Sequence, residues 1–380
     1  MKPKKNRVLK AGALGLSALA ISQASVAQSS VSLYGMVDDG LFWLSNVGGK
    51  QKLFSYAGGA NRFGITGSED IGGGASVFFR LENAFNINNG NLQPAGQGQS
   101  LIFGRLAYVG MRSSNAGSIS LGRQQDVVTD YLGPLTSSYR LWAAGYGAHF
   151  GDVDNFGIDT RYNSSVKYES PTIAGWTGEA AYSVGGVAGH PAQDSGWSLG
   201  ARYVNGPWSA ALGYTTLRNP LAAAYGTSTT GPVVTPSPYA SLYNASRLEF
   251  GGAGVNYVWN KVDSIGFVYT RSVLVDSALA KGNAVYNNFE VNATYYLRPD
   301  IYTGLGYTYT LGSYTTRGKH PVYHQINTGV GYILSKQTIV YTDVVYQRAA
   351  RDAPVAQISL FAASSSRSQL GVGWHLKHFF

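Results

Sequence analysis

Several charged side chains could attract or repel a solute. In the predicted strands they lie on the same face as small polar residues. On an extended backbone, Arg62 alternates in phase with Gly64 and Thr66, and Arg80 with Ser76 and Glu82. By the same alternation, Arg161 shares a face with Lys167. The stretch 125–160 holds five aspartates, Asp126 and Asp130 first among them, and one basic residue. Such side chains offer fixed charges to passing ions and polar solutes.

Bond-making chemistry has no comparable support in the sequence. There is no cysteine, no Gly-x-Ser-x-Gly elbow and no glycine-rich phosphate loop ending in Lys-Ser or Lys-Thr. His320 and His324 have no third ligand nearby in the sequence, so no metal site is expected. A lipid hydrolase would need a Ser/His pair near one rim; His378 has a suitable position, but no serine partner can be assigned. We therefore expect neither an enzyme nor a cofactor.

The first 27 residues differ from the remainder. Five lysines and arginines precede an apolar stretch from 11 to 21, and the small residues Ser25-Val26-Ala27 follow it. This pattern predicts a cleaved secretory signal peptide over 1–27. Cleavage there leaves 353 residues, 28–380, with a net charge of +4. Most of the basic balance thus belongs to the leader, which removes the main argument for nucleic-acid binding.

Beyond the leader, the chain repeatedly alternates large apolar residues with small or polar ones. From Phe289 to Leu297 one face carries the apolar side chains, and the other carries Glu290, Asn292 and Thr294. The last residues repeat the pattern, with Trp374 and Phe380 on the apolar face. A period of two predicts strands whose two faces meet different environments. Glycine counts 49 and tyrosine 27, a composition that favours strands and turns over helices.

Short, turn-rich joints alternate with longer irregular stretches along the chain. Seven short joints and eight long stretches make fifteen connections, so the chain is expected to have sixteen strands. Because that number is even, both ends of the chain lie on the side of the short turns. The short joints are 69–74, 112–117, 170–175, 205–207, 260–263, 297–300 and 334–337, and the long stretches are 44–60, 86–100, 125–160, 185–195, 218–246, 273–286, 312–321 and 349–366.

Sixteen strands with one small, polar face cannot fill a dry core. An all-β, antiparallel transmembrane barrel with an apolar outside and a wet inside accounts for both faces. Aromatic residues near strand ends, such as Trp374, fit the interfacial girdles of such a barrel, and the terminal Phe380 fits a closing residue. A soluble propeller or sandwich is the alternative, but no blade-like repeat is present.

Four segments resemble the general diffusion porins of Gram-negative bacteria, especially the beta-proteobacterial type. They are SVSLYGMVDDG at 30–40, RFGITGSED at 62–70, FGRLAYVG at 103–110 and GSISLGR at 117–123, together with the terminal Phe380. The resemblance covers the whole chain after the leader and rests on dispersed motifs in order. It implies a sixteen-stranded outer-membrane barrel with short periplasmic turns and long extracellular loops, a homotrimer, and a third loop folded into the pore.

The resemblance makes 125–160 the loop that narrows the pore, facing basic residues of the barrel wall. Arg62, Arg80 and Arg161 are expected there by alternation, because a lipid-facing arginine costs about 2–4 kcal/mol at the bilayer midplane. Arg105 fits the family's arginine position, although the alternation over 101–111 assigns it to neither face. Arg123 is expected near a rim or the loop root. Loop acids Asp126 and Asp130 would face these arginines, and Asp38 and Lys167 are further lumen candidates.

The expected function is passive diffusion of ions and small hydrophilic solutes through an outer-membrane channel. An alternative is a selective barrel for a particular organic anion or sugar. Adhesion through the outer loops could coexist with a pore, and loop 218–246, rich in Pro, Thr and Ser, is expected to be exposed. The wall arginines argue for anion preference and the loop acids argue against it, so the sequence favours anions only weakly.

Overall fold

The computed structural model describes residues 29–57, 61–92, 101–141, 145–157, 160–222, 225 and 232–380. The expected signal peptide, 1–27, therefore lies outside the described residues. Within the described residues, no helix is both long enough and apolar enough to cross a membrane.

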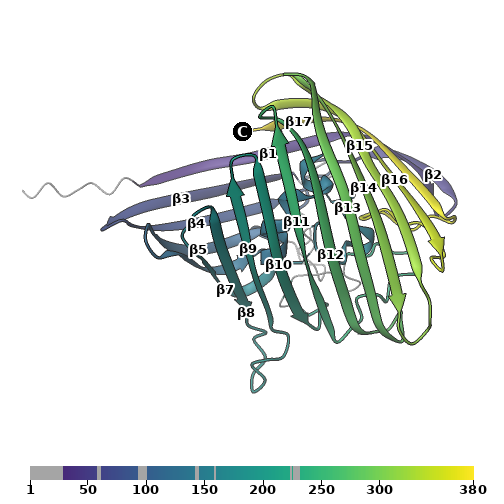
Figure 1. Ribbon diagram of the computed structural model, residues 1–380, viewed down its shortest axis with the longest axis horizontal. Coiled ribbons are helices and arrows are strands. Elements are labelled where there is room, and N and C mark those ends of the chain that lie inside the picture. Colours follow the sequence, from purple (N-terminus) through teal and green to yellow (C-terminus); the bar gives the residue numbers. More distant parts are fainter. Residues whose placement is uncertain are drawn as a thin grey trace, which may run out of the picture.

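Seventeen antiparallel strands form one continuous sheet that closes on itself (Figure 1). Sixteen of them make the barrel, and β2 is a short addition that pairs with the second half of β1. The strands are β1 (Ser30–Val47), β2 (Lys50–Ser55), β3 (Arg62–Gly72), β4 (Ala75–Ala84), β5 (Leu106–Ser113), β6 (Gly117–Gln124), β7 (Tyr162–Glu169), β8 (Trp176–Ser183), β9 (Gly196–Asn205), β10 (Trp208–Arg218), β11 (Arg247–Trp259), β12 (Asp263–Ser277), β13 (Gly282–Arg298), β14 (Ile301–Tyr314), β15 (Pro321–Ile333), β16 (Thr338–Arg351) and β17 (Ser368–Phe379).

Strand β1 closes the barrel by pairing with both ends of the sheet. Its first half pairs with β3, from Ser30 to Met36, and the segment from Met36 to Leu44 pairs with β17. The last residue, Phe380, exchanges two backbone hydrogen bonds with Gly35, at 2.8 and 3.1 Å. No strand edge of the ring is left open, as a membrane barrel requires.

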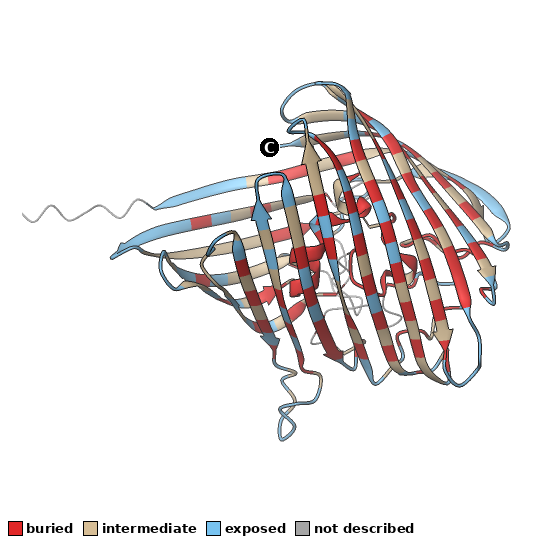
Figure 2. Cartoon of the chain, in the orientation of Figure 1, coloured by how far each residue is buried: buried red, intermediate tan, exposed pale blue. Residues whose placement is uncertain are grey.

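The two faces of the strands differ as the alternation predicts (Figure 2). On β13, Val291 and Tyr295 are about half exposed on the outside, whereas Glu290 and Asn292 are buried on the inside. The outer surface of the barrel is therefore a band of exposed apolar side chains, and the inner surface is polar. This is the arrangement that a hydrocarbon environment outside and water inside would stabilise.

The seven short joints are confirmed as the turns at one end of the barrel. In Figure 1, the turn between β9 and β10 lies at the top and the longer β8–β9 connection at the bottom. Two predicted long stretches are wrong in length: only 278–281 separates β12 from β13, and only 315–320 separates β14 from β15. These hairpins continue further than expected because residues assigned to the connections, such as Val273, Leu274 and Tyr286, pair within the sheet.

Strand β5 explains the ambiguous alternation of 101–111. The strand begins only at Leu106, so the four residues before Arg105 do not belong to it. Val109 and Met111 are about half exposed on the outer face, while Leu106 and Tyr108 line a cavity inside the barrel. Apolar residues thus occur on both faces of this strand.

The connection between β6 and β7, residues 125–161, folds into the barrel and is called loop L3 below. Its helices pack against the inner faces of β8 to β13. Val127, Val128 and Leu132 are fully buried there in the main apolar cluster of the described residues. The helical segments are α1 (Val127–Leu132), η1 (Gly133–Leu135), α2 (Ser137–Arg140) and η2 (Phe150–Asp152).

Candidate functional site

The barrel wall opposite L3 brings together three of the four predicted basic residues around one carboxylate. Glu82 of β4 is 1% exposed and accepts a hydrogen bond from Arg80 Nη2 at 2.7 Å and one from Arg105 Nε at 2.6 Å. Arg62 of β3 lies close enough to interact electrostatically with Arg80, Glu82 and Arg105. Three guanidinium groups and one carboxylate leave this patch with a net positive charge. It is called the arginine patch below.

The side chain of Tyr34 extends from β1 across β3 to contact the arginine patch on β4. Its hydroxyl donates to Glu82 at 2.8 Å and accepts from Arg80 Nε at 2.6 Å, and its ring lies 5.0 Å from the Arg80 guanidinium carbon. The ring passes over Gly64 of β3, where a Cβ atom would come within 2.5 Å of it. Glycine at this position therefore permits the contact. Sequence reasoning used Glu82 only to assign a strand face and did not foresee the Tyr34 contacts, because Tyr34 is 46 positions from Arg80 and 48 from Glu82.

Arg161 does not share a face with Lys167, contrary to the alternation argument. Gly122 pairs with Ser165, but Gln124 pairs with Tyr162, so β7 contains a bulge in which Ser164 has a φ of 47°. The bulge reverses the facing of the residues before it, and Tyr162 becomes the buried inner side chain. The Arg161 backbone N–H donates to the carbonyl of Tyr225, in the β10–β11 connection, at 3.1 Å.

Arg123 lies at the root of L3, as expected. Its side chain is almost buried, and it donates to the carbonyl of Gly104 at 2.8 Å and to Asn163. It thus ties the start of L3 to the β4–β5 connection and to β7.

Asp130 pairs with Lys167, a predicted lumen residue of β7, and not with the arginines it was expected to face. The ammonium group of Lys167 donates to Asp130 and also lies 2.9 Å from Glu179 of β8. Asp130 remains partly exposed, at 28% of its side chain. It lines a cavity of about 310 Å³ between L3 and strands β4 to β9.

Asp126 is buried and fastens L3 instead of facing the arginine patch. It caps α1 by accepting from the Thr129 backbone N–H at 3.0 Å, and it also accepts from the side chains of Thr129, Asn155 and Thr215. Burial raises the pKa of this carboxyl, while these hydrogen bonds act in the opposite direction. The carboxylate joins both ends of L3 to β10.

Asp38 faces inward, as its alternation predicts, but is completely buried. It accepts a hydrogen bond from Tyr341 at 2.6 Å and lies 3.3 Å from the ammonium of Lys377. His375 packs between Asp38 and Asp343, with its ring stacked on Tyr341 at 4.8 Å. These contacts join β1, β16 and β17 where the barrel closes.

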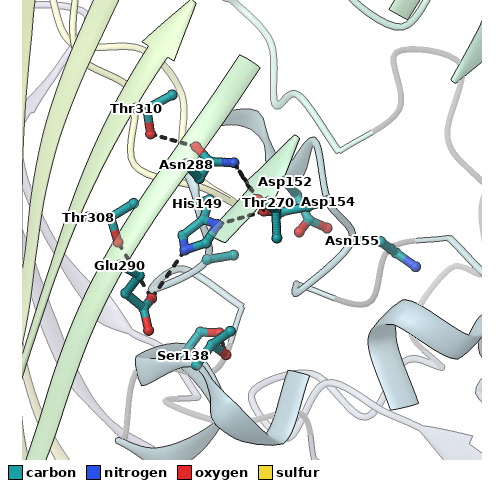
Figure 3. Close-up of polar contacts among 12 residues, drawn as sticks. Ser138, His149, Asp152, Asp154, Asn155, Thr270, Asn288, Glu290, Thr308 and Thr310 are labelled. Carbon is teal, nitrogen blue, oxygen red and sulfur yellow. Dashed lines mark hydrogen bonds and ion pairs between the residues drawn. The ribbon is translucent and has the colours of Figure 1, made fainter. Parts of the chain in front are cut away.

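A buried histidine anchors the return of L3 to the far wall (Figure 3). His149 lies 2.6 Å from Asp154 of the same loop and 3.1 Å from Glu290 of β13. Asp154 also accepts from Thr270 and Asn288 on the wall, at 2.5 and 3.0 Å. Burial alone would lower the pKa of His149, but the two carboxylates outweigh it and raise the pKa to about 10. The histidine is therefore an imidazolium held between two acids.

Aromatic contacts anchor L3 on either side of this histidine. Tyr146 donates its hydroxyl to Asp343 at 2.5 Å and packs against Phe42 and Phe361. The ring of Phe150 stacks on that of Tyr323 at 3.7 Å. Both contacts hold L3 against the wall away from the arginine patch.

Part of the described β10–β11 connection packs inward, so the expectation that loop 218–246 is exposed holds only for some of its residues, such as 234–236 and Pro238. Tyr225, Leu242 and Tyr243 are at most 1% exposed. The Tyr243 hydroxyl lies within hydrogen-bond distance of the carbonyls of Gly151 and Asp152, at 3.0 and 2.9 Å. The aromatic and apolar residues scattered among Pro, Thr and Ser decide the packing, because each can bury a large apolar surface against L3.

The aromatic residues assigned to the membrane boundary lie on the outside of the barrel. Trp374 is 51% exposed and Phe380 is 46% exposed, both near the short-turn end. Trp176 with Tyr203 and Trp208 with Tyr257 pair on the outer surface at the same end, with ring centroids 4.9 and 4.7 Å apart. These positions are those of an interfacial girdle.

Known proteins with similar sequences are porins. The outer membrane porin protein 32 of Delftia acidovorans is 28% identical over 394 residues, which cover 98% of this chain and all of that relative. An outer membrane porin protein of Bordetella pertussis is 29% identical over 222 residues. That alignment covers 50% of this chain and spans about half of the relative's length, 54%.

Solved structures show the same fold. The anion-selective porin of Comamonas acidovorans superposes with a TM-score of 0.70 at 20% identity, covering 93% of this chain and all of that one. Residues 13–352 match the Gram-negative porin family. The closed barrel with a polar interior, the inward loop and these matches agree. The chain belongs to the Gram-negative porin family and is an outer-membrane channel for passive diffusion of small hydrophilic solutes.

Proposed function

We propose that the arginine patch and L3 form the narrowest, selectivity-determining part of this channel, and that the channel favours anions. The patch consists of Arg62, Arg80 and Arg105 with Glu82 and Tyr34. The observation that carries the proposal is its charge: three guanidinium groups surround one carboxylate on the wall opposite the main contacts of L3. A lumen wall with excess positive charge raises the local concentration of anions.

The loop acids do not cancel this charge. Asp126 is buried in the fastening network of L3, and Asp130 is paired with Lys167. Arg161 is left out of the proposed wall, since the register of β7 shifts by one residue between it and Lys167. The anion selectivity named for the Comamonas acidovorans structure is consistent with the proposal.

Arginine suits this task better than lysine. The guanidinium group stays charged at every physiological pH, and it can stack on an aromatic ring while donating hydrogen bonds in its plane. Arg80 does both with Tyr34. These contacts hold the Arg80 guanidinium against the wall while 38% of the side chain stays exposed.

Several further properties of the channel are part of the same proposal. We infer that residues 1–27 are removed on export and that the barrel acts as a homotrimer without enzymatic activity. The resemblance to general diffusion porins supports the trimer, and the residue pattern of 1–27 supports cleavage. Mass spectrometry of the protein isolated from membranes tests both, through the mass of the mature chain and of the native assembly.

The experiment that tests the constriction is a reversal-potential measurement in a planar bilayer across a salt gradient. In the unmodified protein, we expect a reversal potential whose sign indicates a preference for anions. Arg62→Gln, Arg80→Gln and Arg105→Gln should each move it toward cations and raise the conductance. Arg298→Gln, an exposed change of the same charge on the β13–β14 turn, is the matched control. Reversal potentials that do not move in any of the three patch variants would refute the assignment.

A further inference from the structure

The cavity between L3 and the wall carries separated charges of both signs. It is lined by residues of β4 to β9 and of α1, and its volume is about 310 Å³. Arg112, Ser118 and Glu169 lie close to the short turns, so the cavity belongs to the short-turn end of the lumen. The arginine patch borders it through Arg80, but most of its lining is distinct from that patch.

One register row across four strands sets the charge pattern of this cavity. Arg112 of β5 pairs with Ser118 of β6, Ser118 with Glu169 of β7, and Glu169 with Glu179 of β8. All four residues line the cavity. Adjacent strands are about 4.8 Å apart, so the backbones of Arg112 and Glu169 are separated by roughly 10 Å, with only a serine between them.

The positive end of the row has no carboxylate of its own. Among the described residues, no carboxylate lies within ion-pair distance of Arg112, whose guanidinium carbon packs 4.8 Å from the ring centroid of Phe78. Arg80, two residues along β4 from Phe78, lines the same side of the cavity. An aromatic ring stacked on the face of a guanidinium group leaves the N–H donors at its edge free to bind an anionic group.

The negative end holds two carboxylates directly opposite each other. Like charges in this position destabilise a strand pair unless cations compensate. Lys167 compensates Glu179 at 2.9 Å. Among the described residues, the cation paired with Glu169 is Arg202 at 3.9 Å, and both of these side chains are more than a third exposed. A cationic group of a solute could therefore bind Glu169 with little competition.

We propose that this cavity is a subsite for solutes with a carboxylate and an ammonium group at opposite ends, such as short peptides. The carboxylate would bind at Arg112 and Arg80, and the ammonium group at Glu169. The guanidinium group of Arg112 lies over Phe78 of β4, on the side of β5 away from Glu169, so the span exceeds the separation of the backbones. It therefore favours a dipeptide, whose charged groups lie farther apart than those of a single α-amino acid. The inference rests on the proposed function, since a solute reaches the cavity only through an open lumen.

Ion-current noise of the reconstituted channel tests the subsite. The probes are glycylglycine, glycine, N-acetylglycine as an anion and glycinamide as a cation, added to each side in turn at ~0.1 M KCl, where the Debye length is about 10 Å. We expect glycylglycine to remain about two- to fivefold longer than each of the other three, the factor expected for partly exposed ion pairs. Binding events should also be more frequent when the probe is added from the short-turn side.

Variants separate the two ends of the row. Arg112→Gln and Glu169→Gln should each reduce the glycylglycine residence time to that of the singly charged probes, whereas Arg112→Lys should retain part of it. Arg298→Gln is the control, because it removes an exposed charge from the same end of the barrel outside the cavity. Heat-resistant migration on gels and open-channel conductance without probe show that each variant is folded.

The outcomes distinguish this inference from the proposed function. Equal residence of glycylglycine and N-acetylglycine, or unchanged glycylglycine residence in Arg112→Gln and Glu169→Gln, would overturn the subsite while leaving the arginine patch intact. A protein that inserts without conducting would instead refute the open lumen on which both rest.

Discussion

The Nε atom of Arg105 lies 2.6 Å from a carboxylate oxygen of Glu82, and Arg80 donates to the other oxygen at 2.7 Å. One buried acid thus holds two arginines against the wall and reduces their combined charge by one. Because Glu82 lies on the inner face of β4, it lowers the positive charge at the proposed constriction. The selectivity of the channel should therefore depend on Glu82 as much as on the arginines.

Replacing Glu82 by Gln should make the channel more anion-selective. The amide keeps the shape of the side chain but removes one negative charge next to Arg80 and Arg105. A unit charge acting over about 8 Å of water contributes roughly 0.5 kcal/mol, so the permeability ratio should change about twofold. Reversal potentials in a salt gradient measure it. Glu69→Gln, near the exposed β3–β4 turn, is the control, and a shift toward cations in Glu82→Gln would contradict the proposal.

Local sequence patterns were sufficient to predict the barrel strands, but they could not predict the contacts inside the barrel. Strand faces and short turns follow from neighbouring residues, so alternation located sixteen strands and the inward side of Arg62 and Arg80. The bulge at Ser164 is a single extra residue with positive φ, which alternation cannot detect, and it misplaced Arg161. The contacts of Glu82, Asp126 and His149 join residues up to 141 positions apart, and composition does not reveal them.

Replacing His149 by Gln should loosen L3. The imidazolium lies between Asp154 and Glu290, and its removal leaves two buried carboxylates without their cation. Breaking a buried pair in this way costs about 3–5 kcal/mol. We expect a lower free energy of unfolding in urea and greater open-channel noise. The ion selectivity set by the arginine patch should change little. His190→Gln, in the exposed β8–β9 loop, should behave like the unmodified protein.

The His149 contribution should depend on pH with a definite sign. Its pKa is raised from 6.5 to about 10 in the folded protein. A raised pKa stabilises the folded state fully below about 6.5, and the stabilisation is lost as the pH rises through 10. The difference in unfolding free energy between the unmodified protein and His149→Gln should therefore be constant at acidic pH and shrink between pH 6.5 and 10. A difference that grows over this interval would exclude the imidazolium.

Tyr146→Phe should weaken the second attachment of L3. The substitution keeps the ring against Phe42 and Phe361 but removes the donor to Asp343, which is 1% exposed. An acceptor left buried without a partner costs about 1–3 kcal/mol. Increased current noise and a lower unfolding free energy are expected together. Tyr168→Phe, which removes an exposed hydroxyl that donates to Ala116, should change neither.

The two acids of α1 should have separable effects, although they lie one turn apart in the same loop. Asp130 faces the cavity and pairs with Lys167, so Asp130→Asn should add one net positive charge to the lumen and shift selectivity toward anions about twofold. Asp126 is buried among hydrogen-bond donors from Thr129, Asn155 and Thr215. Asp126→Asn retains a capping side chain but loses acceptor capacity, so it should cost about 1–3 kcal/mol of stability. Its reversal potential should remain that of the unmodified protein, because the carboxylate has no path to the lumen. If Asp126→Asn instead shifted the reversal potential as much as Asp130→Asn, both acids would have to face the solute, and the fastening role of Asp126 would be wrong.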